Sequence, residues 1–354
     1  MFNDVYRGKR VLITGNTGFK GSWLALFLQK AGAEIHGYAL PPEGMHNHFQ
    51  LLNLQYNSTF ADIKELDKLL QICREFRPEI IFHLAAQPIV FDSYREPVRT
   101  FADNVMGTVN ILECARQTPS VRGVVAVTSD KCYDVKKSRP PFAEDAPLGG
   151  FDPYSASKAC AEIAVASYRD SFGMNENKFF ASVRAGNVIA GGDWGHDRLL
   201  PDLMRNAANR VTTHLRSPHA VRPWQHVLDA LSGYMTLGMM MLENNPDAAQ
   251  AWNFGPDEPP ASVADLAGEC ARIWDKVKFD FAGAQEFHET QTLILDCTKA
   301  RQLINWSPVW NRSRSIAHTV QWYRDFYSRN QINSQRDLDD YIADAESAGA
   351  IWMS

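Results

Sequence analysis

The sequence has few cysteines, no long apolar run and little net charge, and each shortage excludes a class of protein. None of its six cysteines forms a C-x-x-C pair, so we interpret them as reduced thiols and expect no metal centre. No apolar run approaches the ~18 residues that a membrane span requires. Lysine and arginine total 36 against 41 for aspartate and glutamate, which leaves a net charge of −5. This balance argues against a nucleic-acid-binding protein.

The N-terminus has only three consecutive apolar residues, Val11, Leu12 and Ile13, before Thr14, which is too few for a signal peptide. We therefore expect a soluble protein of the cytoplasm that does not bind membranes. Of the 354 residues, 45% are hydrophobic and 22% are charged, a composition that allows a large core without extended disorder. Because an ordinary domain has ~100–200 residues, we expect one large α/β unit or two lobes.

Strand-like and helix-like segments alternate through the first half of the chain. This β-α-β alternation predicts a parallel, doubly wound α/β sheet with helices on both faces. The expected strands are 11–13, 35–40, 59–63, 79–83, 124–128 and 179–183, and the expected helices include a segment from Phe19, 64–76, 105–116 and 153–172.

The alternation breaks after about residue 187. We therefore predict a sheet domain over 1–186, a smaller lobe over 187–330 that closes over the C-terminal edge of the sheet, and a poorly constrained polar tail with one helix over 331–354. Open α/β sheets bind ligands at that edge. Within the lobe we expect a loop at 191–195, a loop or edge strand at 214–224, and helices at 200–208, 227–242, 263–274 and 315–327.

The first motif is TGNTGFKG, residues 14–21, which places glycines at 15, 18 and 21 between a strand and a helix. Gly15 permits a tight turn, Gly18 lets the backbone approach a pyrophosphate, and Gly21 allows the helix to pack on the strand. The motif alone is also compatible with an ordinary turn. The second strand ends in residues 38–41, YALP, without an acidic residue for a ribose or an arginine for a 2′-phosphate. We therefore predict a Rossmann-type domain that binds NAD, less tightly than usual.

The second motif is Tyr154-x-x-x-Lys158, which follows Asp152 and Pro153 at an expected helix start. The two side chains then lie one turn apart on one helix face. A phenol has a pKa of ~10, and we expect the Lys158 ammonium and a positive nicotinamide ring to lower the pKa of Tyr154 toward neutrality. A lone pair of this kind is more often part of a solvated helix. Its combination with the glycine motif favours the catalytic interpretation.

The third motif, TSDKCY over residues 128–133, follows the fifth expected strand. Polar residues at that end of a parallel strand face the ligand, although a simple strand-capping turn would use the same residue types.

Together these motifs resemble the extended short-chain dehydrogenase/reductase family and, within it, the bacterial CDP-D-glucose 4,6-dehydratases. The resemblance runs from about Gly8 to Tyr327. TSDKCYD discriminates best, because related dTDP-glucose dehydratases have Thr-Asp-Glu in place of Ser129, Asp130 and Lys131, and most epimerases lack the acid pair. The most specific segments are GNTGFKGSWL at 15–24, TSDKCYD at 128–134, RAGNVIAGGDW at 184–194 and RPWQHVL at 222–228.

The resemblance implies oxidation at C4 of the sugar of a CDP-sugar by NAD, elimination of water across C5 and C6, and hydride return to C6. Tyr154 would accept the 4-hydroxyl proton, Ser129 would bond the same hydroxyl, and Lys158 would hold the nicotinamide ribose. Asp130 would protonate the departing 6-hydroxyl, and Lys131 would remove the C5 proton. A lysine accepts a proton only when neutral, so we expect Asp130 to be protonated at that stage. Alternatively, Lys131 only stabilises the enolate, and water or Tyr154 takes the proton.

The resemblance also implies that 187–330 is mainly a nucleotide-sugar-binding lobe. Arg222 would bind the pyrophosphate, since a guanidinium makes two charge-assisted bonds there. His226 and His288 are candidate pocket residues, but each is more often a structural histidine. The implied cofactor contacts are Gly15, Thr17, Gly18, Phe19, Lys20, Gly21, Asp62, Ile63, Ala85, Ala86, Gln87, Asn104, Tyr154 and Lys158, and the implied substrate contacts are Gln87, Ser129, Asn187, Arg198, Leu199, Arg216 and Arg222.

Phe91, followed by Asp92, stands where close relatives have arginine, in a loop near the sugar. The identity of the sugar is therefore not fixed by the sequence, and a CDP-heptose is an alternative to CDP-glucose. A nucleotide-sugar epimerase or reductase is a second reading, which the acid pair disfavours. A silent nucleotide-sugar or NAD sensor is a third, which the intact Ser129, Tyr154 and Lys158 disfavour. Family habit implies a homodimer through the helices that begin near Val105 and Pro153.

Overall fold

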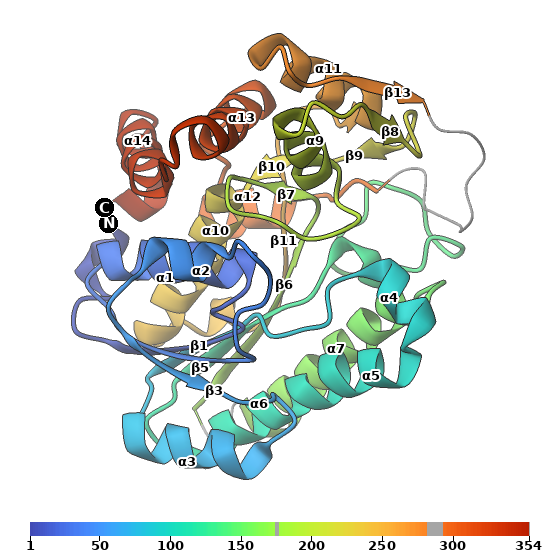
Figure 1. Ribbon diagram of the computed structural model, residues 1–354. Helices are drawn as coiled ribbons and strands as arrows, with labels where there is room; N and C mark the ends of the chain where they lie inside the picture. The colour runs from blue at the N-terminus through green and yellow to red at the C-terminus, as the bar shows by residue number, and fades with distance from the viewer. Residues whose placement is uncertain (174–176, 282–292, 354) are drawn as a thin grey trace.

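Seven parallel strands form the central sheet, in the order β11-β6-β5-β4-β1-β2-β3 (Figure 1). The computed structural model describes residues 1–173, 177–281 and 293–353. The chain builds outward from β1 to β3 and then crosses to β4 and builds the other way, which confirms the predicted doubly wound, Rossmann-type α/β sheet. The strands are β1 Arg10–Thr14, β2 Glu34–Ala39, β3 Asn57–Phe60, β4 Ile80–His83, β5 Gly123–Val127, β6 Phe179–Ala185 and β11 Ala251–Phe254.

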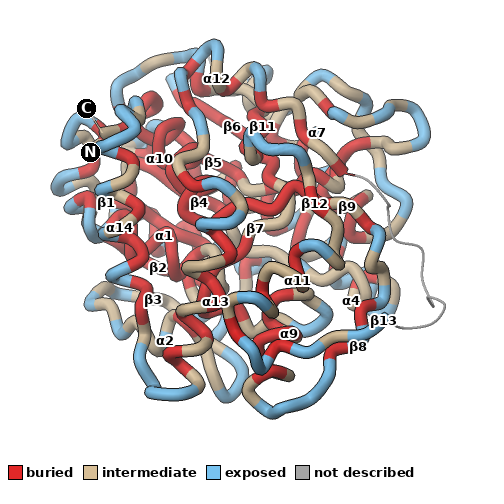
Figure 2. The backbone as a smooth tube through the Cα atoms, turned by 90° about the horizontal axis from the view of Figure 1, so that it is seen from above, coloured by how far each residue is buried: buried red, intermediate tan, exposed pale blue. Residues whose placement is uncertain are grey.

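Helices cover both faces of the sheet. One face carries α1 (Phe19–Lys30) and α10 (Val227–Leu242), and the other carries α3 (Leu66–Phe76), α6 (Gly107–Gln117) and α7 (Pro153–Tyr168). Val11 and Ile13 of β1 pack on the first face and Leu12 on the second, because successive strand residues point to opposite sides. Burial on both sides requires the continuous apolar runs that the sequence shows, and Figure 2 shows the central strands largely as buried chain.

A lobe with its own hydrophobic cluster lies over the C-terminal edge of the sheet (Figure 1). Leu203, Trp224, Leu266 and Trp322 belong to this cluster. The lobe contains α9 (Leu199–Ala208), α11 (Val263–Ile273), α13 (Arg312–Arg329), and the short pairs β7 (Val188–Ile189) with β10 (Gln225–His226), β9 (Val221–Arg222) with β12 (Ala261–Ser262), and β8 (Thr213–Leu215) with β13 (Phe279–Phe281). The remaining α-helices of the described ranges are α2 (His48–Leu52), α4 (Val90–Arg95), α5 (Pro97–Phe101), α12 (Thr298–Ile304) and α14 (Ser334–Ser347).

Several element ends differ from the predicted ones. β3 ends at Phe60 rather than residue 63, because the Asp62 carboxylate accepts a hydrogen bond from the Lys64 N–H and forms a turn. π-helical turns precede α6 from Ala102 and extend α7 to Gly173. No helix in the described ranges is long and apolar enough to cross a membrane.

The predicted boundary at residue 186 does not separate two cores. β11 lies beyond it in sequence and pairs with β6, so that Ala251 lies opposite Ser182, and α10 packs on the sheet face. Without β11 the edge of β6 would expose unpaired backbone groups. Residues 187–330 therefore complete the sheet as well as forming the lobe.

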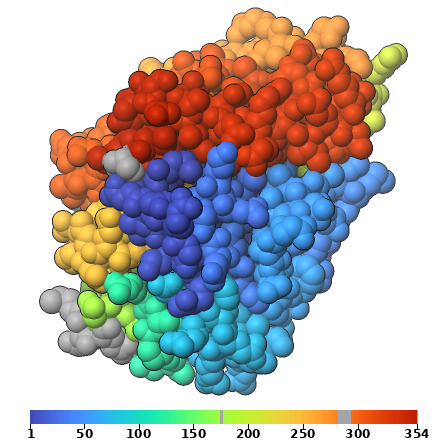
Figure 3. Space-filling model, turned by 90° about the vertical axis from the view of Figure 1, so that its left-hand side faces the viewer, coloured from blue at the N-terminus to red at the C-terminus, as the bar shows by residue number. Residues whose placement is uncertain are grey.

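The helix predicted within 331–354 is present as α14, but the prediction that this tail is poorly constrained is wrong. Leu338 and Tyr341 of α14 are fully buried, and the Trp352 ring stacks on the rings of Phe2, at 5.2 Å, and Tyr341, at 5.7 Å. Figure 3 shows the C-terminal residues lying against the N-terminal ones. The tail looked unconstrained because its few apolar residues are separated by polar ones, which is the pattern of a helix that buries one face.

Candidate active site

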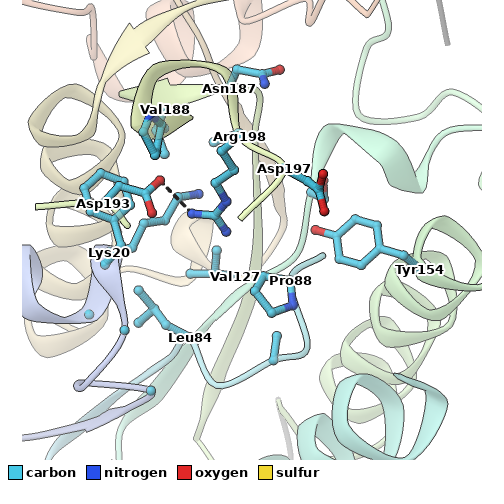
Figure 4. Close-up of a pocket in the computed structure, with 18 of the residues that line it drawn as sticks. Lys20, Leu84, Pro88, Val127, Tyr154, Asn187, Val188, Asp193, Asp197 and Arg198 are labelled. Carbon is cyan, nitrogen blue, oxygen red and sulfur yellow. Dashed lines mark hydrogen bonds and ion pairs between the residues drawn. The ribbon is translucent and has the colours of Figure 1, made fainter. Parts of the chain in front are cut away.

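A cavity of about 550 Å³ lies between the C-terminal edge of the sheet and the lobe (Figure 4). We call its wall from residues 15, 17–21, 38–40, 61–64, 84–86 and 88 the cofactor half. We call its wall from residues 185–190, 193, 197–202, 213–217, 222 and 224 the substrate half. Ser129, Asp130, Lys131, Tyr154 and Lys158 line the cavity as well. The predicted catalytic residues, which are spread over 30 positions of the sequence, therefore meet at one place.

The glycine turn is held so closely that side chains do not fit. Gly15 has a φ of +74°, and a Cβ on it would lie 2.7 Å from the Ala85 nitrogen. A Cβ on Gly21 would lie 2.1 Å from the Gly15 carbonyl oxygen. Gly18 is the N-cap of α1, and the first N–H groups of a helix have no partner within the helix. This cradle fits the pyrophosphate of a dinucleotide.

Most of the other predicted cofactor residues line the same half, and two do not. Gln87 and Asn104 lie behind the wall: the Asn104 side chain accepts a hydrogen bond from the Gln87 N–H, at 2.8 Å, and donates one to the Gln87 carbonyl oxygen, at 3.1 Å. Asn104 therefore supports the segment 85–88 rather than facing the cavity. The residues found in the cofactor half are Gly15, Thr17, Gly18, Phe19, Lys20, Gly21, Asp62, Ile63, Ala85 and Ala86.

The third motif forms a 3₁₀ turn, Asp130–Cys132, directly after β5. The Ser129 hydroxyl accepts a hydrogen bond from the Lys131 N–H, at 3.2 Å, and donates one to Asp130 Oδ1, at 3.1 Å. Asp130 is buried, and burial raises the pKa of its carboxyl although Lys131, Ser129, Arg222 and Lys20 oppose the shift. Burial therefore shifts the Asp130 carboxyl toward the protonated form, which is the form that an acid needs.

Tyr154 and Lys158 lie in the first two turns of α7, which begins as predicted, since the Asp152 carboxylate accepts a hydrogen bond from the Ser155 N–H at 2.8 Å. Burial raises the pKa of Tyr154 to about 12, against the opposing effect of Ser129. The expected lowering by Lys158 is not found: the Lys158 Nζ lies 6.0 Å from the centre of the Tyr154 ring and donates to the Val127 carbonyl oxygen. Burial and the charge of Lys20 lower the pKa of Lys158 itself to about 8.

A buried ion pair connects α7 to the turn that carries Asp130. Glu162 and Arg184 are 2.7 Å apart, with side chains only 2% and 3% exposed. Glu162 also accepts a hydrogen bond from the Thr128 hydroxyl, and the Arg184 guanidinium donates to the Tyr133 hydroxyl. Thr128 and Tyr133 flank the 3₁₀ turn, so this network holds the turn in place relative to Tyr154 and Lys158.

The substrate half carries paired charges. Arg198 contacts Asp193 at 2.8 Å and Arg216 contacts Asp197 at 2.9 Å. In Figure 4, Lys20 extends from the glycine turn toward the first of these pairs, and the charges of Arg198 and Asp193 both influence its pKa. Asn187, Leu199 and Arg222 line this half as well, as expected.

A family model described as the NAD dependent epimerase/dehydratase family matches residues 11–255. The chain belongs to this family. Since its members depend on NAD, and the glycine cradle fits a dinucleotide, NAD is the cofactor, as predicted.

Relatives within the family act on nucleotide sugars. The chain is 41% identical to the CDP-glucose 4,6-dehydratase of Salmonella typhimurium over 352 residues, which cover 96% of this chain and 98% of that protein. It shares its fold with the dTDP-glucose 4,6-dehydratase of Streptomyces venezuelae with NAD and TYD bound, at a TM-score of 0.77, 22% identity and coverage of 92% of this chain and 99% of that one. The UDP-glucose 4-epimerase of Thermotoga maritima aligns with a TM-score of 0.78, 22% identity and coverage of 89% and 99%.

Sequence reasoning missed four acidic residues that line the cavity, Asp103, Asp193, Asp197 and Asp202. Asp193 lies in the RAGNVIAGGDW segment, so its signal was present, whereas Asp197 follows in a loop without any pattern. His226 is structural: it is fully buried, lies 4.7 Å from the Trp310 ring, and accepts a hydrogen bond from the Leu228 N–H. His288 lies outside the described residues.

Proposed function

We propose that the chain is a CDP-glucose 4,6-dehydratase, which converts CDP-glucose to CDP-4-dehydro-6-deoxy-D-glucose and water. The observation that carries the proposal is the buried Asp130 beside Lys131, in the cavity that Tyr154 also lines. An epimerase needs no acid to expel a hydroxyl, whereas a dehydratase does. The 41% identity to a CDP-glucose 4,6-dehydratase over nearly the whole chain supports the nucleotide and the sugar.

In the first step the C4 hydroxyl of the sugar loses a proton and a hydride. Tyr154 takes the proton, and Ser129 bonds the same oxygen. When bound, NAD supplies the hydride acceptor for C4 and the hydride donor for C6. Because burial raises the pKa of Tyr154, positive charge must favour its phenolate; Arg198 acts in this direction, and Lys158 holds the nicotinamide ribose.

In the second step the new ketone makes the C5 proton acidic, and water leaves across C5 and C6. Asp130 donates its proton to the departing 6-hydroxyl, a role that suits a carboxyl whose pKa burial raises. Lys131 removes the C5 proton, and the alternative is that it stabilises the enolate while Tyr154 or water takes that proton. The two electrons then return to C6 as hydride, and the group that took the C5 proton gives it back to C5, so the net reaction is the loss of one water.

Arg222 and Arg216 bind the diphosphate, and the other predicted residues of the substrate half surround the sugar and nucleoside. A guanidinium suits a diphosphate because its planar N–H groups match the phosphate oxygens. A larger CDP-sugar is the alternative substrate, because Phe91 stands where close relatives have arginine in the loop near the sugar.

We also propose a homodimer that forms through the helices from residues 105 and 153. Exposed apolar side chains support it: Val98 and Phe101 of α5, Met106 before α6 and Ile163 of α7 are 82%, 37%, 51% and 58% exposed. Covering them would remove apolar surface from water. Light scattering should give the dimer mass, and Ile163→Asp should give the monomer. The cytoplasmic location stays a prediction from the sequence.

The function is tested with purified protein, CDP-glucose and NAD. We expect a product lighter by one water in mass spectrometry and the ultraviolet absorbance of a 4-keto-6-deoxy sugar in alkali. CDP-heptose and UDP-glucose are the comparison substrates. If only CDP-heptose is turned over, the substrate is CDP-heptose rather than CDP-glucose. Interconversion of epimers without loss of water would contradict the dehydratase activity. NAD binding without turnover of any substrate would favour a sensor.

A further inference from the structure

An aromatic ring and a guanidinium stack at the mouth of the cavity. The Arg216 guanidinium carbon lies 4.9 Å from the centre of the Phe91 ring. Phe91 belongs to α4, which follows β4 of the sheet domain, whereas Arg216 follows β8 of the lobe. The contact therefore joins the two parts of the molecule that enclose the cavity.

The same guanidinium also contacts a carboxylate. Arg216 and Asp197 are 2.9 Å apart, and their side chains are 49% and 37% exposed, so the pair lies where the cavity opens to solvent. Asp197 has a φ of +59°, a left-handed conformation that costs energy for a residue other than glycine. Figure 4 shows Asp197 among the side chains that line the cavity.

We propose that Phe91 is a positioning residue for the substrate: its ring holds the Arg216 guanidinium across the cavity mouth as a ligand for the diphosphate of the nucleotide sugar, and Asp197 occupies that guanidinium until the diphosphate replaces it. The inference rests on the proposed function, because it requires a substrate with a diphosphate.

The chemistry of the three groups supports these roles. A ring stacked on the face of a guanidinium attracts its charge and leaves the N–H groups directed outward in the plane, where a phosphate can accept two of them. An arginine side chain on its own loses considerable rotamer freedom when it is fixed, and the ring provides that ordering before the ligand arrives.

The exposure of Asp197 makes it replaceable. A half-exposed ion pair contributes little, because water solvates both partners. A diphosphate carries more negative charge than a carboxylate and repels Asp197, so it competes well for Arg216. Asp202, whose pKa the charges of Asp197 and Arg216 also influence, is itself paired with Arg205 at 2.9 Å.

The test compares CDP with cytidine by isothermal titration calorimetry, because the two ligands differ only in the diphosphate. We expect Phe91→Ala to weaken CDP binding by about 5- to 30-fold and to leave cytidine binding unchanged. Phe91→Tyr keeps the ring and should bind CDP like the parent protein. Asp197→Asn removes the competing charge and should strengthen CDP binding. In turnover, Phe91→Ala should raise KM and leave kcat unchanged.

A double variant checks that Phe91 acts through Arg216. Arg216→Met should weaken CDP binding, and adding Phe91→Ala to it should cause no further loss. NAD affinity, measured with each variant, reports on correct folding and should stay constant. The inference is overturned if Phe91→Ala weakens cytidine and CDP equally, if Phe91→Tyr behaves like Phe91→Ala, if Asp197→Asn weakens CDP, or if the double variant is additive.

The failure of the proposed function gives a different result. If CDP binds with this variant pattern but CDP-glucose does not turn over, the activity is wrong and the inference stands. If UDP, dTDP, GDP or ADP binds in place of CDP with the same pattern, the base is wrong and the inference stands. If the parent protein binds no nucleoside diphosphate, the inference is wrong as well.

Discussion

The cofactor half and the substrate half of the cavity are built in different ways. The cofactor half is formed largely by backbone, and at two of its glycines, Gly15 and Gly21, any side chain would collide with neighbouring backbone. The substrate half is formed by side chains, and two of its arginines contact an aspartate of the same half, Asp193 for Arg198 and Asp197 for Arg216.

The difference shows how each half achieves recognition. Backbone N–H groups at a helix start keep their direction whatever the solvent contains, so the cofactor half depends on shape. In the substrate half, each paired aspartate neutralises the charge of its arginine until an anionic ligand competes for that arginine. Ligand binding to this half therefore depends on charge and on the salt concentration. The catalytic residues lie between the halves, where burial shifts the pKa values of Asp130, Tyr154 and Lys158.

The largest effect is expected between the halves, at Asp130. Asp130→Asn keeps the shape but removes the proton donor, so kcat for the dehydratase should fall by about 10²–10⁴. Oxidation at C4 does not need this acid, and absorbance of the reduced cofactor should therefore persist after substrate is added. Asp145→Asn, at an exposed carboxylate, is the control and should be unchanged. Normal turnover by Asp130→Asn would remove Asp130 from the mechanism.

The cofactor half is tested by shape at Gly21. Gly21→Ala would place a methyl group 2.1 Å from the Gly15 carbonyl oxygen, and we expect about 1–3 kcal/mol of destabilisation together with a large loss of NAD affinity. Gly268→Ala is the matched control, because a Cβ there meets nothing within 4 Å and helical Gly→Ala changes favour folding by about 0.5–1 kcal/mol. Calorimetry with NAD and thermal unfolding measure both outcomes; unchanged NAD binding by Gly21→Ala would contradict a cradle of backbone.

The substrate half is tested by salt. Raising sodium chloride from about 50 to about 500 mM shortens the reach of charges from more than 10 Å to a few Å. We therefore expect KM for the CDP-sugar to rise several-fold and the Kd for NAD to change less. Both ligands are titrated at the same salt concentrations, so that each serves as the control for the other. If the affinities of the two ligands fall equally steeply with salt concentration, both halves recognise charge.

The smallest effect is expected at Lys20, which extends from the cofactor half toward the other side. Its charge helps to lower the pKa of Lys158 to about 8, so Lys20→Met should raise that pKa, and Lys158 should stay positive to higher pH. The alkaline limb of the rate profile should then move up by about half a pH unit. Lys20→Arg retains the charge and should leave the limb in place. A downward shift in Lys20→Met would show that Lys158 does not set this limb.

The cofactor half was predictable because its signal is local. Gly15, Gly18 and Gly21 are needed at a fixed spacing whatever the rest of the chain does, and Tyr154 and Lys158 are set by one helix period. The position of Asn104 behind the wall was not predictable, because its bonds to Gln87 form only when the π-helical turn before α6 packs beside the segment after β4.

The pKa of Tyr154 shows a second limit of local reasoning. The motif predicted a lowered pKa for Tyr154 from the charges of Lys158 and of a bound nicotinamide ring. In the structure, burial of the phenol in the assembled cavity raises the pKa of Tyr154 to about 12, and Ser129 and Arg198, rather than Lys158, oppose this shift. The burial of Tyr154 depends on the lobe as well as on the sheet, so it cannot be predicted from a local sequence motif.

The amino-acid sequence by itself determined the doubly wound sheet, the dinucleotide cradle and the helix that carries Tyr154 and Lys158, because strand and helix periods and glycine spacing are local properties. Only the tertiary structure decided that β11 completes the sheet, that the last helix packs against the first residues, and that Phe91 lies on Arg216. These contacts join residues that are distant in the chain, and their stability comes from surfaces that exist only after both partners have folded.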